Sequence, residues 1–171
     1  MSKKNLHSEV EIPQALNLTT SVSLGPLQVE FLQRSLSTLE PRMPLCLTQE
    51  ASLLAAISAL RENNIGCVLI VDQRGKLIGI FSERDCILKV TAPAHEYANA
   101  KVVDFMTPDP VTQPPNGSIG YALNLMSQGG FRHIPIVDQD HMPIGILSVK
   151  NVVDYLVKSF TQALLALDTT I

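Results

Sequence analysis

The chain has 171 residues, of which 46% are hydrophobic and 17% are charged. This composition is sufficient for a buried core and excludes an intrinsically disordered chain. The formal net charge is -3 and no run is rich in lysine or arginine, so a nucleic-acid partner is not expected. The apolar runs are about six residues long, whereas a membrane-spanning helix needs roughly 20, so no membrane partner is expected either.

The segment 1–40 is predicted to form an N-terminal tail and a helix. Residues 1–10 are polar and lack the apolar core of a signal peptide, which favours a cytoplasmic protein. Residues 1 to about 20 are expected to be mobile. Apolar residues at helical spacing predict a helix over 26–39 that packs on the rest of the chain or on a second copy.

From residue 41 onward, two copies of one structural unit are predicted, the first (41–97) including a linker and the second at 98–160. The Val-Asp-Gln sequence at 71–73 recurs at 137–139, and the Ile-Gly-Ile sequence at 78–80 recurs at 144–146. With this constant offset, the copies align without a gap over 44–85 and 110–151. Such self-similarity indicates that both copies share a fold. The segment 1–40 does not take part in this repeat.

Each copy is predicted to have the order β-α-β-β-α, beginning with an extended segment and including one turn between the two later strands. In the first copy the extended segment, helix, strand, turn, strand and helix span 44–47, 51–63, 67–71, 73–76, 77–81 and 82–90. In the second copy they span 110–113, 118–128, 133–137, 139–142, 144–147 and 148–160. The first helix of each copy has one apolar face, and the uninterrupted apolar runs predict strands buried on both sides.

Two further segments complete the chain. Residues 91–103 are predicted to form a linker between the copies. Residues 161–171 are predicted to extend the last helix, and the apolar side of 160–167 favours self-association.

The sequence offers no signature of catalysis or of a metal site. The three cysteines, Cys46, Cys67 and Cys86, are widely spaced, which predicts buried free thiols in a reducing compartment and no disulfide or zinc site. No Ser/His/Asp set, Cys/His set, paired carboxylate motif or phosphate-binding glycine loop is present. A protein that is not an enzyme and requires no metal is therefore expected.

Both copies resemble CBS domains in their motifs. The second copy carries Met-Thr-Pro-Asp-Pro-Val at 106–111, Phe-Arg-His-Ile-Pro-Ile-Val-Asp at 131–138 and Gly-Ile-Leu-Ser at 145–148. The first carries Ile-Gly-Cys-Val-Leu-Ile-Val-Asp at 65–72 and Gly-Ile-Phe-Ser-Glu-Arg-Asp at 79–85. The resemblance covers about residues 41–160.

The resemblance implies a fold and a ligand class. The fold is α/β (α+β), with two β-α-β-β-α repeats packed through their sheets as a pseudo-two-fold pair with two related clefts. Such pairs associate as dimers, so a homodimer is expected. Their clefts hold AMP, ADP, ATP or S-adenosylmethionine, so an adenine ligand of this kind is expected without a required metal.

By this resemblance, one cleft lies at the end of the first repeat. A nucleotide needs a carboxylate for its ribose hydroxyls, cations or helix N–H groups for phosphates, and an apolar slot for adenine. Asp85 is expected to hold the ribose, Ser82 to assist with ribose or phosphate, and Gly79 to allow close approach of the ligand. The Ser-x-x-Asp spacing is also close to a capping box, so a purely structural role is the alternative.

The second repeat is expected to complete this cleft. The resemblance assigns the adenine slot to Thr107, Pro110, Val111 and Thr112, and phosphate contacts to Arg132, His133 and Lys150. The alternatives are a solvated lysine at 150 and a partly buried structural histidine at 133. In the second cleft, Ser148 and Asn151 take the positions of Ser82 and Asp85. Because asparagine lacks a charge, that cleft is expected to be weak, empty or differently selective.

The resemblance therefore predicts a regulatory module. An adenine ligand would stabilise one arrangement of the two repeats and thereby alter an unknown partner protein in trans. The alternative is a ligand-free dimeric interaction scaffold.

Overall fold

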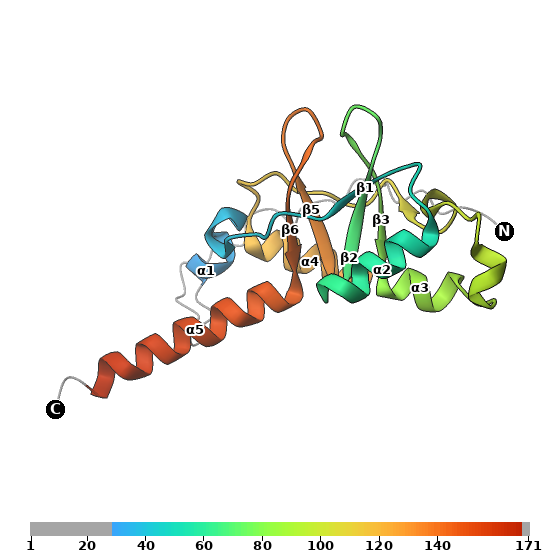
Figure 1. Ribbon diagram of the computed structural model, residues 1–171. Helices are drawn as coiled ribbons and strands as arrows, with labels where there is room; N and C mark the ends of the chain where they lie inside the picture. Colours follow the sequence, from blue (N-terminus) through green and yellow to red (C-terminus); the bar gives the residue numbers. More distant parts are fainter. Residues whose placement is uncertain (1–28, 169–171) are drawn as a thin grey trace.

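The computed structural model describes residues 29–168 (Figure 1). The predictions for residues 1–20, and for the start of the helix over 26–39, lie outside this range. Two sheets stand side by side at the centre, and helices flank them (Figure 1). Each repeat starts with a leading segment, which we define as residues 41–48 in the first repeat and 107–114 in the second.

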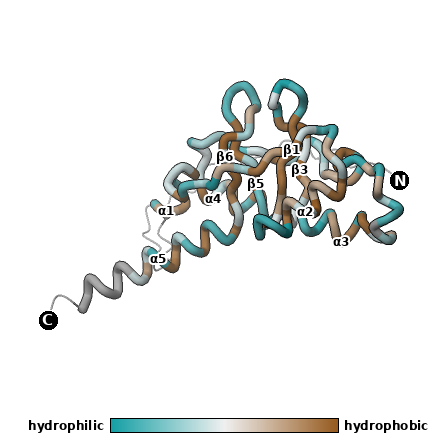
Figure 2. Tube along the Cα trace, viewed as in Figure 1, coloured by the Kyte–Doolittle hydropathy of each residue, from teal (hydrophilic) through white to brown (hydrophobic). Residues whose placement is uncertain are grey.

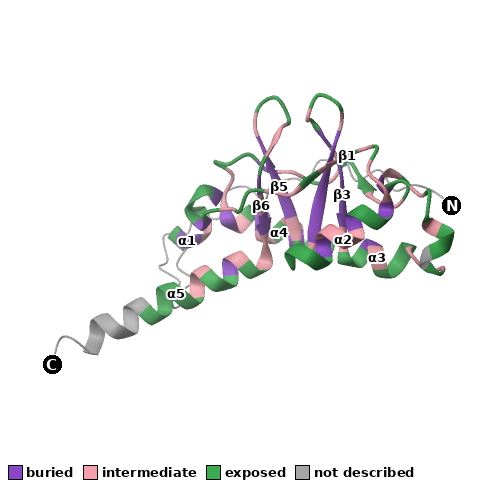
Figure 3. Ribbon diagram, viewed as in Figure 1, coloured by how far each residue is buried: buried purple, intermediate pink, exposed green. Residues whose placement is uncertain are grey.

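The first repeat builds a four-stranded sheet in the order β1-β2-β3-β4. β1 (Cys46–Thr48) pairs in parallel with β2 (Cys67–Val71), and β2 pairs antiparallel with β3 (Leu77–Ser82). β4 (Thr107–Pro108) comes from the second leading segment and pairs antiparallel with β3. All five residues of β2 are buried, as its uninterrupted apolar sequence predicts (Figure 3).

The second sheet repeats this arrangement. β5 (His133–Val137) and β6 (Pro143–Ser148) form its antiparallel centre. Gln113 of the second leading segment pairs in parallel with β5, and Arg42 of the first leading segment pairs antiparallel with β6. Each leading segment therefore contributes to both sheets, and the predicted pseudo-two-fold pair is confirmed.

Four helices occur where the sequence predicts them, with α5 running beyond residue 160. They are α2 (Leu53–Asn63), α3 (Glu83–Lys89), α4 (Ile119–Gly129) and α5 (Val149–Asp168). Ser52 begins α2 because its Oγ accepts a hydrogen bond from the N–H of Ala55, at 3.1 Å. α4 ends at Gly130, whose φ of 65° suits a residue without a side chain. α5 extends away from the body of the molecule (Figure 1).

The core has three parts, and the strands that build it are the most apolar segments of the repeats (Figure 2). In the first repeat, α2 packs on one face of the sheet, and the buried residues are Leu53, Ala56, Leu60, Val68, Ile70, Phe81 and Val102. The second repeat has an equivalent cluster that includes Ile119, Ala122, Met126, Ile134, Ile136 and Leu147. A third cluster contains residues of both sheets, namely Cys67, Leu69, Leu77, Ile80 and Val137 with Ile146. The repeats are therefore joined through their sheets by a continuous apolar contact.

The described residues just before residue 41 have a counterpart in the other repeat, which the sequence analysis did not expect. The N–H of Leu36 donates to the carbonyl of Gly117, and the N–H of Val102, at the equivalent place in the other repeat, donates to the equivalent carbonyl of Ala51. The segments before the two leading segments are therefore counterparts, and each packs on one repeat. Their side chains differ, as in Arg34 against Ala100. Because backbone pairing does not need identical side chains, a search for identities missed this part of the repeat.

These counterpart segments consist of short helical turns. They are α1 (Val29–Gln33) with η1 (Leu36–Leu39), and η2 (Ala94–Tyr97) with η3 (Val102–Asp104). The single helix predicted over 26–39 is thus interrupted at Ser35, whose extended backbone pairs with Ser118.

Two other sequence expectations can be compared with the fold. Cys67 is buried, as predicted, whereas Cys86 is half-buried and Cys46 is exposed. All three thiols are free. Within residues 29–168, no helix combines the length and the apolar character needed to cross a bilayer.

Candidate functional site

The start of α3 places the two central residues of the predicted site. Ser82 ends β3 in an extended conformation and begins the helix, and its Oγ accepts a hydrogen bond from the N–H of Asp85, at 3.3 Å. Asp85 Oδ2 accepts in return from the N–H of Ser82 at 2.9 Å and from its Oγ at 2.6 Å. The Ser-x-x-Asp sequence therefore forms a capping box. The cap uses only Oδ2, and the partners of Oδ1 lie outside the cap.

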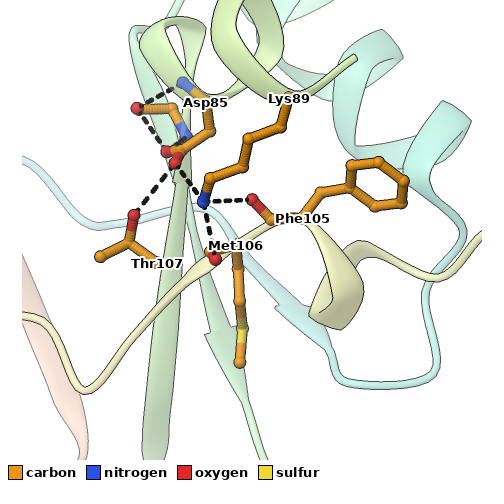
Figure 4. Close-up of polar contacts among 6 residues, drawn as sticks. Asp85, Lys89, Phe105, Met106 and Thr107 are labelled. Carbon is orange, nitrogen blue, oxygen red and sulfur yellow. Dashed lines mark hydrogen bonds and ion pairs between the residues drawn. The ribbon is translucent and has the colours of Figure 1, made fainter. Parts of the chain in front are cut away.

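The second oxygen of Asp85 connects α3 to the start of the second repeat (Figure 4). Asp85 Oδ1 accepts from Thr107 Oγ1 at 3.0 Å and from Lys89 Nζ at 2.7 Å. Lys89 Nζ also donates to the carbonyls of Phe105 at 2.7 Å and Met106 at 2.9 Å. Burial acts to raise the pKa of Asp85, but the hydrogen bonds from Lys89, Ser82 and Thr107 outweigh it and hold this pKa below its usual value.

Asp85 faces a pocket of about 470 Å³ that both repeats build. The first repeat supplies the end of β3 and one side of α3, with Gly66, Ile80, Ser82, Glu83, Arg84, Asp85, Leu88 and Lys89. The second supplies its leading segment and the residues before β5, with Thr107, Asp109, Pro110, Val111, Gly129, Gly130, Phe131, Arg132 and His133. The volume is within the range of about 300–1,000 Å³ that small-molecule sites occupy.

Contacts between the repeats fix the mouth of this pocket. Arg84 Nη1 donates to the carbonyl of Gly130 at 2.7 Å. The imidazole of His133 lies so close to Gly66 that a Cβ at that position would be 2.7 Å from the ring carbon Cε1. Burial, with a contribution from Arg132, holds the pKa of His133 below its usual value, although Glu83 acts in the opposite direction. A ligand in the pocket would therefore touch both repeats.

The pocket contains seven of the twelve residues predicted for ligand binding. These are Ser82, Asp85, Thr107, Pro110, Val111, Arg132 and His133. Among the described residues, the pocket wall does not include Gly79, Thr112, Ser148, Lys150 or Asn151.

For two of these five residues, the structure shows why they do not line the pocket. The space in front of Gly79 is filled by the Met106 side chain, so the absence of a side chain admits Met106 rather than a ligand. Lys150 forms an exposed ion pair with Asp154 in the first turns of α5. Lys150 therefore lies outside the pocket wall, because the second repeat borders this pocket with residues before β5 and not with those after β6.

Lys89 is the main pocket residue that the sequence analysis missed. It lies four residues after Asp85, so both side chains project from the same face of α3. The i, i+4 spacing of Asp85 and Lys89 is the feature of the sequence that predicts their contact.

The second repeat has the same cap with different surroundings. Asn151 Oδ1 accepts from the N–H and the Oγ of Ser148, at 2.9 and 2.7 Å. The counterpart of Lys89 is Tyr155, whose OH accepts from Arg34 Nη1 at 2.8 Å. The Tyr155 ring also stacks on Phe31, with 5.5 Å between ring centroids. The residue equivalent to Lys89 therefore contacts residues that precede the first leading segment.

Comparison with known proteins agrees with this architecture of two repeats that share a pocket. The chain belongs to the CBS domain family, whose pattern matches residues 41–91 and 102–158. A relative from Bacillus subtilis, the CBS domain-containing protein YhcV, is 34% identical over 55% of this chain and 65% of its own length. This chain spans 54% to 65% of the length of four curated relatives that it matches.

Solved structures have the same fold. The CBS domain protein PAE2072 from Pyrobaculum aerophilum, complexed with AMP, is 21% identical with a TM-score of 0.61, over 68% of this chain and 88% of that one. The CBS domain pair of MJ0100, in complex with 5-methylthioadenosine and S-adenosyl-L-methionine, is 23% identical with a TM-score of 0.62, over 71% and 98%. At these identities the similarity shows the fold.

Proposed function

We propose that this chain is a regulatory module that binds an adenine-containing ligand in the pocket at Asp85. The observation that carries the proposal is a buried carboxylate that faces a pocket built by both repeats, with Arg132 and His133 also lining that pocket. A carboxylate can accept a hydrogen bond from a ribose hydroxyl, and the guanidinium of Arg132 can interact with a phosphate or a carboxylate of the ligand. The ligands named for PAE2072 and MJ0100 support an adenine compound.

The regulatory step follows from the position of the pocket. A ligand that contacts both repeats binds one relative arrangement better than another, and it shifts the population toward that arrangement. A partner protein that contacts both repeats would then bind with a different affinity. Neither step requires catalysis, and we propose that the chain turns over no nucleotide.

Calorimetric titration of AMP, ADP, ATP, 5-methylthioadenosine and S-adenosylmethionine tests the proposal. Asp85→Asn is the matched variant, because Asn151 shows that asparagine keeps the cap in this fold. Loss of the charge should weaken binding by about 1.5–3 kcal/mol, or roughly ten- to a hundredfold. Asp140→Asn, the same change at an exposed loop position, should leave binding unaltered.

Absence of binding by every ligand would support the alternative, a ligand-free interaction scaffold. Binding that Asp85→Asn does not weaken would place the ligand elsewhere.

We also propose that the module is a homodimer. Val153, Val157 and Phe160 are exposed on α5, and Ile87 and Leu88 are exposed on α3. Exposed apolar side chains on each of these helices favour association. Light scattering should give twice the mass of one chain, and a monomer at micromolar concentration would contradict the proposal.

The three free thiols support a reducing compartment, and we propose the cytoplasm.

A further inference from the structure

The carboxylate of Asp85 has no hydrogen-bonding capacity left for a ligand. A carboxylate offers about four acceptor positions. All are in use, because Oδ2 accepts from the N–H and the Oγ of Ser82, and Oδ1 accepts from Thr107 Oγ1 and Lys89 Nζ. A ribose hydroxyl can therefore bind Asp85 only if one of these donors leaves.

Lys89 is a donor that can leave without a change in the backbone around the site. The two contacts from Ser82 belong to the cap of α3, and the backbone of Thr107 is paired in β4. Lys89 reaches Asp85 through a flexible side chain that is 37% exposed, whereas the Asp85 side chain is 10% exposed. A long side chain that is partly in water can adopt another rotamer without opening the core.

The contacts that Lys89 makes differ from those of a simple ion pair on a helix surface. The pair between Lys150 and Asp154 has the same i, i+4 spacing, but both of its side chains are exposed, at 76% and 53%. Lys89 Nζ instead uses all three of its N–H donors within the protein. One contacts the buried carboxylate of Asp85, and the other two donate to the consecutive carbonyls of Phe105 and Met106 (Figure 4). It thereby connects α3 to the segment that joins η3 to β4.

We propose that Lys89 is an internal competitor of the ligand, which closes the Asp85 site when it is empty and releases the Phe105–Met106 segment when a ribose binds. This inference rests on the proposed function, since it assumes that the ligand donates to Asp85. On this proposal, ligand binding at Asp85 changes the contacts of the backbone at Phe105 and Met106. The carbonyls that lose Lys89 lie directly before Thr107, which pairs with β3 and also donates to Asp85.

The test compares Lys89→Met with wild type, using adenosine as the ligand. Adenosine has the ribose hydroxyls and no phosphate, so removal of a positive charge takes away no attraction to the ligand. Methionine keeps the aliphatic part of the side chain and cannot donate. Lys101→Met is the control, because Lys101 forms an exposed ion pair with Glu50 and does not contact Asp85.

Lys89→Met should bind adenosine about fivefold more tightly than wild type, which corresponds to the loss of one partly exposed competing ion pair. Lys101→Met should bind like wild type. Hydrogen exchange of the peptide over residues 102–107 should increase when wild type binds adenosine. In Lys89→Met the exchange should already be high without ligand and should change little on binding.

The outcomes separate this inference from the proposed function. If wild type binds adenosine and Lys89→Met binds equally or more weakly, the competitor role is wrong and the nucleotide site remains. If Lys89→Met loses affinity for AMP alone, Lys89 is a phosphate contact and the competitor role is also wrong. If neither variant binds adenosine, AMP or S-adenosylmethionine, both inferences are overturned.

Discussion

Replacing Asp85 with asparagine should destabilise the protein even without a ligand. The asparagine oxygen can keep the contacts with Ser82, as Asn151 does with Ser148 in the second repeat. The change removes the negative charge that Lys89 and Thr107 contact, at 2.7 and 3.0 Å. The cap is retained, so the predicted effect isolates the charge.

The magnitude follows from the two contacts that weaken. Because Lys89 is 37% exposed, solvent screening limits its contribution to less than about 1 kcal/mol. The hydroxyl of Thr107 donating to a buried carboxylate contributes about 1 kcal/mol. A loss of about 1–2 kcal/mol in the free energy of unfolding is expected. For a chain of this size it corresponds to a decrease of roughly 2–8 °C in Tm.

The effect should depend on pH in a defined direction. The folded pKa of Asp85 lies below the unfolded value, so the ionised carboxylate stabilises the fold at all pH values above about 4. This stabilisation is lost as the pH falls through the lower, folded pKa. Urea unfolding at pH 7.5, 5.0 and 3.5 should show the full difference between wild type and Asp85→Asn at the first two values and a smaller one at the third. Equal stability at pH 7.5, or a difference that persists undiminished in acid, would refute a stabilising charge at Asp85.

Three further changes test other parts of the site. Gly79→Ala should cost about 1–3 kcal/mol because the new methyl group collides with the Met106 side chain, and Met106→Ala in the same chain should relieve at least about 1 kcal/mol of that cost in a double-mutant cycle. His133 has a lowered pKa, so stability should decrease as the pH falls below about 6.5, and His133→Gln should reduce the difference between urea unfolding at pH 7.5 and 5.5. Burial, with Glu83, raises the pKa of Cys67 to about 12, so a thiol reagent at pH 8 should label the exposed Cys46 and leave Cys67 unmodified until the protein unfolds.

The sequence is most informative where side chains alone decide the structure. The strand over Cys67–Val71 has the bounds predicted for it, because a short apolar run between polar turns is typical of a buried strand. The second strand of each repeat is one or two residues longer than predicted, since backbone pairing continues into the serine that begins the next helix.

The site could be predicted only in part. Asp85, Thr107 and His133 meet in one pocket although they are distant in sequence, and family resemblance, rather than spacing, brought them together. The motif does not predict that Lys150 lies outside this pocket wall, because a motif shows which residues recur and not which cleft each one borders. The interruption at Ser35 was missed because it depends on pairing with Ser118, a contact to which local helical spacing gives no clue.

The exchange of leading segments between the sheets has a consequence for how the protein is made. Arg42 cannot pair with β6, and Arg34 cannot contact the distant Tyr155, until the residues up to 155 have left the ribosome. The first repeat likewise lacks β4 until the second has begun to emerge. Neither repeat can complete its own sheet before the other repeat has been synthesised. Folding should therefore be slow, because of the distant pairings, and should end with both repeats becoming ordered together.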